Sequence, residues 1–159
     1  MTIARLRAED LDAVMQIERQ SFRSPWRRSF FLADLNRPES LLLAAHLGTD
    51  LVGYLVAWRV ADELHLANIA VAQPFRRQGV ATQLLHSVLE FGQQTACREI
   101  YLEVRPSNLP AIRFYEKEGF RYCYTRSRYY PDGEDALVYR RMLDRVTPCP
   151  ARPSTAPAQ

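Results

Sequence analysis

Apolar residues follow two different spacings along the chain, and each spacing predicts one kind of element. Where they recur three or four positions apart, as from Leu11 to Ile17 and from Ala81 to Leu89, they mark one face of a helix. Short apolar runs bounded by Gly, Asp or Pro predict strands. The expected strands cover 3–6, 41–47, 51–60, 63–71, 100–104, 121–129 and 136–143, and the expected helices cover 8–17, 28–35, 81–94 and 109–118.

The order of these elements indicates the fold class. Three successive strands joined by short turns predict an antiparallel meander, whereas the strand–helix–strand segments that follow are typical of a sheet with helices packed on it. We therefore expect a mixed α/β fold, with a mostly antiparallel sheet of about six to seven strands flanked by about four helices.

Composition narrows the class of protein. The chain has 159 residues, of which 47% are hydrophobic and 25% charged, as in an ordinary globular domain, and we expect one domain over 1–145. It contains no apolar run long enough to span a membrane and begins with no apolar signal segment, so the cytoplasm is the expected compartment. Segment 146–159 is rich in proline and poor in apolar residues, which predicts a disordered tail.

Charge and metal-binding residue types exclude further classes. The net charge of +3 forms no concentrated basic stripe, so no nucleic-acid partner is expected. The cysteines and histidines show no ligand spacing, so no metal site is expected, and we interpret the histidines as structural or surface residues. These residues are Cys97, Cys123, Cys149, His46, His65 and His86.

A candidate anion site follows the predicted strand 63–71. After Gln73 and Pro74 the chain runs through a loop that ends in a glycine and opens a helix, whose first N–H groups and positive dipole end suit a pyrophosphate. Gly79 lets the backbone approach an anion closely, and two arginines add charge-assisted hydrogen bonds. The loop and first turn comprise Arg76, Arg77, Gln78, Gly79, Val80, Ala81 and Thr82. From the spacing alone, an ordinary strand–loop–helix junction remains open.

Two short sequence motifs, which follow one another along the chain, resemble the motifs of one enzyme family. Arg76-x-x-Gly79-x-Ala81 is similar to the Gln/Arg-x-x-Gly-x-Gly/Ala signature of the GNAT N-acetyltransferases. Downstream, the segment from Asn108 through Tyr115 to Phe120 resembles the family's Asn-x-x-Ala-x-x-x-Tyr-x-x-x-Gly-Phe block. The resemblance covers about 1–144 and implies that acetyl-CoA is the cosubstrate.

The same resemblance implies where the coenzyme would bind. The amides of the loop 76–82 would hold its pyrophosphate, and the backbone of the preceding strand would bind the pantetheine arm. The strand residues concerned are Ile69, Ala70 and Val71. Asn108 would cap the following helix and also contact the pantetheine arm.

Acetyl transfer to an amine needs a base and an acid. Glu103 lies in the apolar stretch 100–104, where a partly desolvated carboxylate has a raised pKa and can serve as the base. Tyr115 carries a phenol that can donate a proton to the leaving thiolate, a role that the resemblance implies. The residues alone also allow a rim carboxylate paired with Arg105 or Arg77, and a packed aromatic ring at position 115.

Two further segments resemble the bacterial ribosomal-protein alanine N-acetyltransferases within this family. Ser21-Phe22 with Pro25-Trp26 resembles a segment that lines the acceptor groove, and 128–136 resembles Asn-Tyr-Tyr-Pro…Glu-Asp-Ala, with Arg128 in place of Asn. The acceptor is then the N-terminal alanine of a ribosomal protein. The expected acceptor-binding residues are Phe22, Trp26, Tyr129, Tyr130 and Glu134.

Other functions fit parts of the pattern. Tyr129 and Tyr130 could be edge-strand residues, and Glu134 part of a solvated turn. The same fold could acetylate lysine or a small amine, or bind acetyl-CoA without catalysis. Glu103 and Tyr115 together favour an enzyme.

Overall fold

The computed structural model describes residues 1–143 of the chain. The predicted tail, 146–159, and Cys149 lie outside the described residues. The observed elements follow the expected order of strands and helices, with two short 3₁₀ turns added before α1 and α3. They are β1 (Thr2–Arg5), η1 (Ala8–Asp10), α1 (Leu11–Ser21), α2 (Arg28–Leu35), β2 (Ser40–Leu47), β3 (Asp50–Val60), β4 (Glu63–Val71), η2 (Gln73–Phe75), α3 (Val80–Gln94), β5 (Glu99–Val104), α4 (Leu109–Lys117), β6 (Arg121–Arg126) and β7 (Ala136–Met142).

The strands form a seven-stranded sheet in the order β1-β2-β3-β4-β5-β7-β6. β4 and β5 run parallel, while β1–β2, β2–β3, β5–β7 and β6–β7 are antiparallel. The predicted mixed, mostly antiparallel sheet with four α-helices is therefore confirmed. The described chain divides into two compact units, 1–58 with 67–88 and 59–66 with 89–143, so that β3, β4 and α3 contribute to both.

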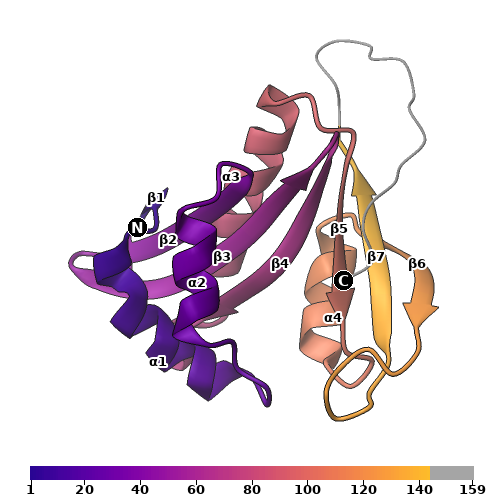
Figure 1. Cartoon of the computed structure of the whole chain (residues 1–159), viewed down its shortest axis with the longest axis horizontal. Coiled ribbons are helices and arrows are strands. Elements are labelled where there is room, and N and C mark those ends of the chain that lie inside the picture. Colours follow the sequence, from indigo (N-terminus) through magenta and orange to yellow (C-terminus); the bar gives the residue numbers. More distant parts are fainter. Residues whose placement is uncertain (144–159) are drawn as a thin grey trace. The chain divides into compact units, whose positions relative to one another are not determined.

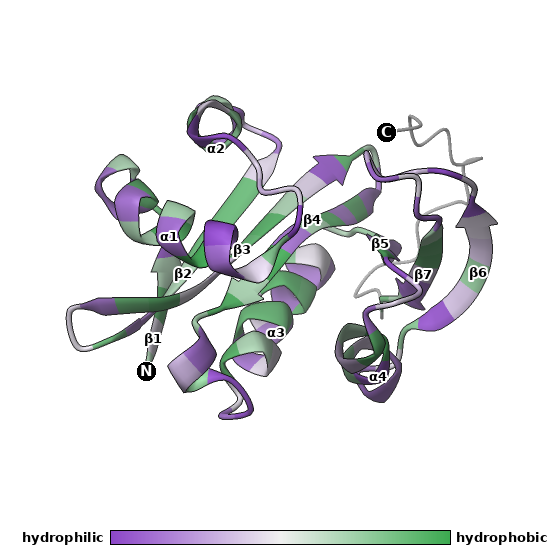
Figure 2. Ribbon diagram, turned by 90° about the horizontal axis from the view of Figure 1, so that it is seen from below, coloured by the Kyte–Doolittle hydropathy of each residue, from purple (hydrophilic) through white to green (hydrophobic). Residues whose placement is uncertain are grey.

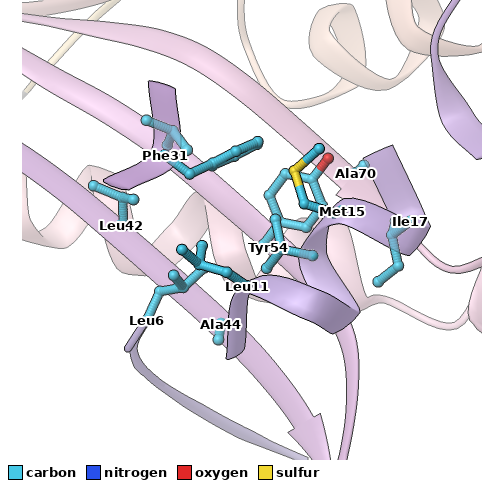
Figure 3. Close-up of a cluster of buried hydrophobic side chains, with 11 residues drawn as sticks. Leu6, Leu11, Met15, Ile17, Phe31, Leu42, Ala44, Tyr54 and Ala70 are labelled. Carbon is cyan, nitrogen blue, oxygen red and sulfur yellow. The ribbon is translucent and has the colours of Figure 1, made fainter. Parts of the chain in front are cut away.

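In the first unit, helices cover both faces of the strands. α1 and α2 lie on one side of β2, β3 and β4, and the beginning of α3 lies on the other (Figures 1 and 2). Between α1, α2 and the strands is an apolar core, most of which Figure 3 labels. Its buried members are Leu6, Leu11, Val14, Met15, Ile17, Phe31, Leu42, Ala44, Tyr54, Val56 and Ala70. The helical spacing predicted from Leu11 to Ile17 is thus the buried face of α1.

A missing side chain in β3 brings α3 close to the sheet. A Cβ at Gly53 would lie 3.0 Å from Cγ1 of Val80 and 3.1 Å from the carbonyl oxygen of Ala70. Only glycine leaves room for this approach without a shift of backbone or side chain. Gly53 therefore positions the first residue of α3 against the end of β4, next to the predicted anion loop.

In the second unit, β5 is the central strand. The beginning of β4 pairs with it in parallel, with Glu63 opposite Glu99 and His65 opposite Tyr101. β7 and β6 continue on the other side, and α4 runs alongside these strands (Figure 1). The register places two buried carboxylates, those of Glu63 and Glu99, beside each other.

Ion pairs and a raised pKa accompany this carboxylate pair. Arg98 binds Glu63 at 2.6 Å, and Arg140 binds Glu99 at 3.0 Å. Burial, together with a hydrogen bond to Glu63, raises the pKa of Glu99 to about 7. Because Glu63 and Glu99 lie opposite each other, a negative charge on one carboxyl disfavours ionisation of the other.

β6 ends three residues earlier than predicted. It stops at Arg126, and 127–135 form a loop that carries both Tyr129 and Tyr130. Arg128 adopts a left-handed conformation with φ +49°, and its N–H donates to Oδ1 of Asp135 at 2.9 Å. A residue with this φ cannot continue a strand, so the alternative of Tyr129 and Tyr130 as edge-strand residues is wrong.

Candidate active site

The predicted anion loop leaves the end of β4 through the 3₁₀ turn at Pro74. The Arg76 guanidinium is used within the fold, because its Nε donates to the carbonyl oxygen of Val71 at 3.0 Å and its Nη2 to Oγ of Ser21 at 3.3 Å. Gln78 closes the loop with a 3.0 Å bond from Nε2 to the carbonyl oxygen of Pro74. Arg76 therefore joins the end of β4 to the end of α1.

The backbone of this loop fits a phosphate group. Arg77 and Gly79 have φ of +61° and +83°, and a Cβ at Gly79 would meet no atom within 4 Å. Both residues are exposed, and α3 begins directly afterwards at Val80. Left-handed residues before a helix turn successive N–H groups to one side, and the first-turn amides, including those of Ala81 and Thr82, have no partner within the helix. These groups would hold the pyrophosphate of acetyl-CoA, whose place here remains a prediction.

A buried carboxylate that the sequence did not indicate connects the neighbouring elements. Glu18 of α1 is 1% exposed and accepts hydrogen bonds from the Trp26 backbone N–H at 2.9 Å, the Asn68 side chain at 2.9 Å and the Tyr54 hydroxyl. Asn68 directly precedes the strand residues 69–71 that are expected to bind the pantetheine arm. Glu18 thus joins the α1–α2 segment to this part of β4.

The two predicted acceptor-binding rings of the first unit are partly buried. Phe22 and Trp26 pack on the apolar core between α1, α2 and the sheet. The Trp26 ring stacks on Trp58, with ring centroids 6.0 Å apart and planes at 13°, and Trp58 donates from Nε1 to Asp34 at 2.9 Å. The core and the Glu18 bond therefore fix the position of Trp26.

In the second unit, Glu103 lies in a cluster of charged and aromatic side chains. Its side chain is 7% exposed, Oε2 lies 2.5 Å from Nε2 of His65, and Oε1 lies 3.8 Å from Nε of Arg126. The alternative of Arg105 as its partner is wrong, because the Nη1 of Arg105 binds Asp132 and Glu134 instead. Within residues 1–143 no donor makes a hydrogen bond to Oε1 of Glu103.

Sequence reasoning did not place His65 in this cluster. Its side chain is 2% exposed, and its ring stacks on Tyr101 with centroids 4.6 Å apart. The parallel β4–β5 register sets His65 opposite Tyr101, two residues before Glu103, and this register cannot be read from the spacing of histidines. Burial and the neighbouring Glu103 raise the pKa of Tyr101 to about 12.

The predicted acid, Tyr115, is buried in α4. Its ring packs against Phe114 and Phe120, with centroids 5.3 and 5.6 Å away. Tyr115 is therefore a packed aromatic ring, as the alternative interpretation of position 115 expected. Burial raises the pKa of Tyr115, which keeps the phenol protonated. Asn108 caps the same helix, because its side chain accepts from the Ala111 N–H at 3.3 Å.

The remaining predicted acceptor residues lie in the loop 127–135. The rings of Tyr129 and Tyr130 meet edge to face at 5.0 Å, and burial raises the pKa of both, with a contribution from Glu103. Glu134 accepts from Arg105 and from both the N–H and the hydroxyl of Ser107. Its carboxylate thus has partners within the fold.

The predicted residues therefore fall into two groups, one in each compact unit. The anion loop, residues 69–71, Phe22 and Trp26 belong to the first unit, and Glu103, Tyr115, Asn108, Tyr129, Tyr130 and Glu134 to the second. Within the described 143 residues, no cluster of His, Cys, Asp and Glu suits a metal ion, and no helix is long and apolar enough to cross a membrane.

Residues 11–120 match the model of the Acetyltransferase (GNAT) family. The chain belongs to this family. It is 34% identical over 141 residues to the [Ribosomal protein bS18]-alanine N-acetyltransferase of Escherichia coli K12, covering 86% of this chain and 94% of that protein. It is 33% identical over 155 residues to an N-alpha-acetyltransferase of Saccharolobus solfataricus, covering 89% and 93%.

A solved structure agrees with this assignment. The crystal structure of the ribosomal-protein-S18-alanine N-acetyltransferase from Escherichia coli superposes with a TM-score of 0.84 at 31% identity, covering 92% of this chain and 96% of that chain. This protein is therefore an N-acetyltransferase of the GNAT family, and acetyl-CoA is its cosubstrate.

Proposed function

We propose that this acetyltransferase transfers the acetyl group of acetyl-CoA to the N-terminal α-amine of a ribosomal protein, with alanine as the first residue. The observation that carries the proposal is the buried Glu103 carboxylate, which His65 and Arg126 hold while Oε1 accepts no hydrogen bond from residues 1–143. The similarity to alanine N-acetyltransferases over most of both chains supports this choice of acceptor.

Glu103 acts as the base. Oε1 takes a proton from the ammonium of the acceptor, directly or through water, and the neutral amine then attacks the thioester carbon. An α-amine has an ordinary pKa of about 8, against about 10.4 for lysine, so a weaker base is sufficient to deprotonate it. His65 holds the second oxygen, which fixes the direction in which Oε1 points.

Tyr115 assists departure of coenzyme A. As the new C–N bond forms and the C–S bond breaks, the sulfur becomes a thiolate, which the Tyr115 phenol stabilises as a hydrogen-bond donor. Because burial raises the pKa of Tyr115, complete transfer of its proton to the thiolate, whose thiol has an ordinary pKa of about 8.5, is uphill. The main contribution of Tyr115 is then the hydrogen bond. The acceptor nitrogen loses two protons in all: Glu103 takes the first before attack and passes it to water, and the second leaves the nitrogen after the C–N bond forms and protonates the departing thiolate, which gives the thiol of coenzyme A.

Variants of both residues test this mechanism. Glu103→Gln and Tyr115→Phe should each lower kcat by roughly 10²–10⁴-fold while acetyl-CoA still binds, which calorimetric titration measures. Glu90→Gln and Tyr122→Phe, at exposed positions of α3 and β6, are matched controls that should leave kcat unchanged. Wild-type kcat in Glu103→Gln would remove the base assignment.

Acetyl transfer to a set of matched peptides identifies the acceptor. Acetyl transfer is measured on peptides that differ only in the first residue, on the same peptides with a blocked N-terminus, and on blocked peptides that contain lysine. We expect transfer to free N-terminal alanine and none to blocked peptides. Transfer that persists on blocked, lysine-containing peptides and is absent from free alanine would instead identify a lysine acetyltransferase, and coenzyme binding without any transfer a non-catalytic module.

A further inference from the structure

Several residues of the loop 127–135 pack around the guanidinium group of Arg105. Arg105 directly follows β5, and its Nη1 donates to Oδ1 and Oδ2 of Asp132 at 2.9 and 2.8 Å and to Oε1 of Glu134 at 3.0 Å. The guanidinium carbon also lies 4.0 Å from the centre of the Tyr130 ring. Charge-assisted bonds of this kind are about twice as strong as neutral ones.

The two carboxylates bound by Arg105 organise the rest of the loop. Asp132 accepts the N–H of Glu134 at 3.1 Å, and Glu134 accepts the N–H and hydroxyl of Ser107, each at 3.0 Å. These bonds, led by that from the Ser107 hydroxyl, lower the pKa of Glu134. The negative charge of Glu134, one of the expected acceptor-binding residues, is therefore compensated by partners within the fold.

The backbone of the loop closes on the same residues. The Tyr130 N–H donates to the Glu134 carbonyl oxygen at 3.1 Å, and the Gly133 N–H donates to the Tyr130 carbonyl oxygen at 2.9 Å. Tyr130 also holds Tyr129 through the edge-to-face contact at 5.0 Å. A displacement of Arg105 would thus reach both tyrosine rings.

We propose that Arg105 is a positioning residue for the acceptor peptide. Through the contacts described above, Arg105, two residues after Glu103 in the chain, fixes Tyr130 and, through Tyr130, Tyr129 before the peptide binds. This inference rests on the proposed function, since it assumes that the two rings contact the acceptor. A loop that is ordered in advance spares the peptide the entropy cost of ordering it.

Kinetics separate positioning from catalysis. In Arg105→Gln we expect KM for an alanine-terminated peptide to rise about 10- to 100-fold, while kcat at saturating peptide and KM for acetyl-CoA stay within about threefold. Arg105→Lys keeps the charge without the planar fork and should recover part of the loss. Arg113→Gln, at an exposed arginine of α4, is the matched control and should behave as wild type.

Hydrogen exchange gives a readout that needs no turnover. The amides of Tyr130 and Gly133 should exchange faster in Arg105→Gln than in wild type or Arg113→Gln, whereas amides of β5 should not change. Unchanged peptide KM together with unchanged exchange in a folded Arg105→Gln would overturn the inference. Equal losses in kcat and both KM values with a lower unfolding temperature would also overturn it, by assigning Arg105 to stability alone.

The inference and the proposed function fail in different ways. If wild type transfers no acetyl group to alanine-terminated peptides, the proposed acceptor is wrong whatever Arg105 does. If wild type is active on them and the Arg105→Gln peptide KM equals that of wild type, the acceptor stands and the positioning role is wrong.

Discussion

Replacing Tyr54 with Phe tests whether the buried Glu18 carboxylate depends on the donors around it. Tyr54 is fully buried in β3 and donates its hydroxyl to Glu18, while its ring meets Phe31 edge to face at 5.8 Å. Phe keeps the ring and its packing and removes one donor. Glu18 retains its bonds from Trp26 and Asn68, so only one interaction changes.

The expected cost follows from the charge on the acceptor. A hydrogen bond to a charged group contributes about 1.5–3 kcal/mol, so the free energy of unfolding should fall by about 2 kcal/mol. For a domain of this size, this corresponds to a decrease in Tm of roughly 4–8 °C. Denaturant unfolding followed by circular dichroism measures the change, and the m-value should stay constant because the folded packing is retained.

A control and a double-mutant cycle make the test specific. Tyr122→Phe removes an exposed hydroxyl that meets Thr125 at 2.9 Å and should change stability by no more than about 0.5 kcal/mol. Combining Tyr54→Phe with Glu18→Gln should give less than the sum of the two single effects, because the first removes the donor and the second the acceptor charge of the same bond. Equal stability of Tyr54→Phe and Tyr122→Phe would refute the reasoning.

Three further predictions concern stability. Because burial raises the pKa of Glu99 to about 7, the contribution of its protonated form to the free energy of unfolding is complete below about pH 4.5 and is lost as the pH rises through 7. The loss should reach up to about 3 kcal/mol relative to Glu99→Gln. Denaturant unfolding of both proteins at pH 5 and pH 8 checks this, and parallel pH profiles would contradict it. In Gly92→Ala, the new Cβ would lie 2.7 Å from Cδ1 of Leu143 and 2.8 Å from Cδ1 of Leu64, and the overpacking cost of about 1–3 kcal/mol should exceed the helix gain of about 1 kcal/mol, as denaturant unfolding would detect. Asn108→Ala removes the cap of α4 and should cost about 1 kcal/mol in the same assay, whereas no change would mean that the cap bond contributes nothing.

The fold could be predicted from sequence because its signals are local. The helical spacing of α1, the turn residues between strands and the cap at Asn108 each depend on a few neighbouring residues. The end of β6 could not be predicted, because Arg128 adopts a left-handed conformation and its N–H bonds Asp135, seven residues further along the loop. Periodicity does not report such bonds.

The candidate site shows the same division. The anion loop and Glu103 stand in recognisable local patterns. His65 reaches Glu103 only through the β4–β5 register. The donors to Glu18 lie 8 to 50 residues away in the chain: the backbone N–H of Trp26 and the side chains of Tyr54 and Asn68. The spacing of residues within a helix does not indicate which distant donors will bind a buried carboxylate. The partners of Glu18 and His65 could therefore be identified only from the structure.

The irregular pairing of β6 bears on how readily this edge of the sheet could pair with another chain. β6 is an edge strand, and its register with β7 shifts at Cys123, so that Tyr122 and Tyr124 lie opposite consecutive residues of β7. An extra residue in an edge strand twists it and breaks the row of N–H and C=O groups that another chain would need for pairing. Shortening β6 by this one residue would regularise the edge, and the exposed tyrosines would then face solvent on a strand open to aggregation.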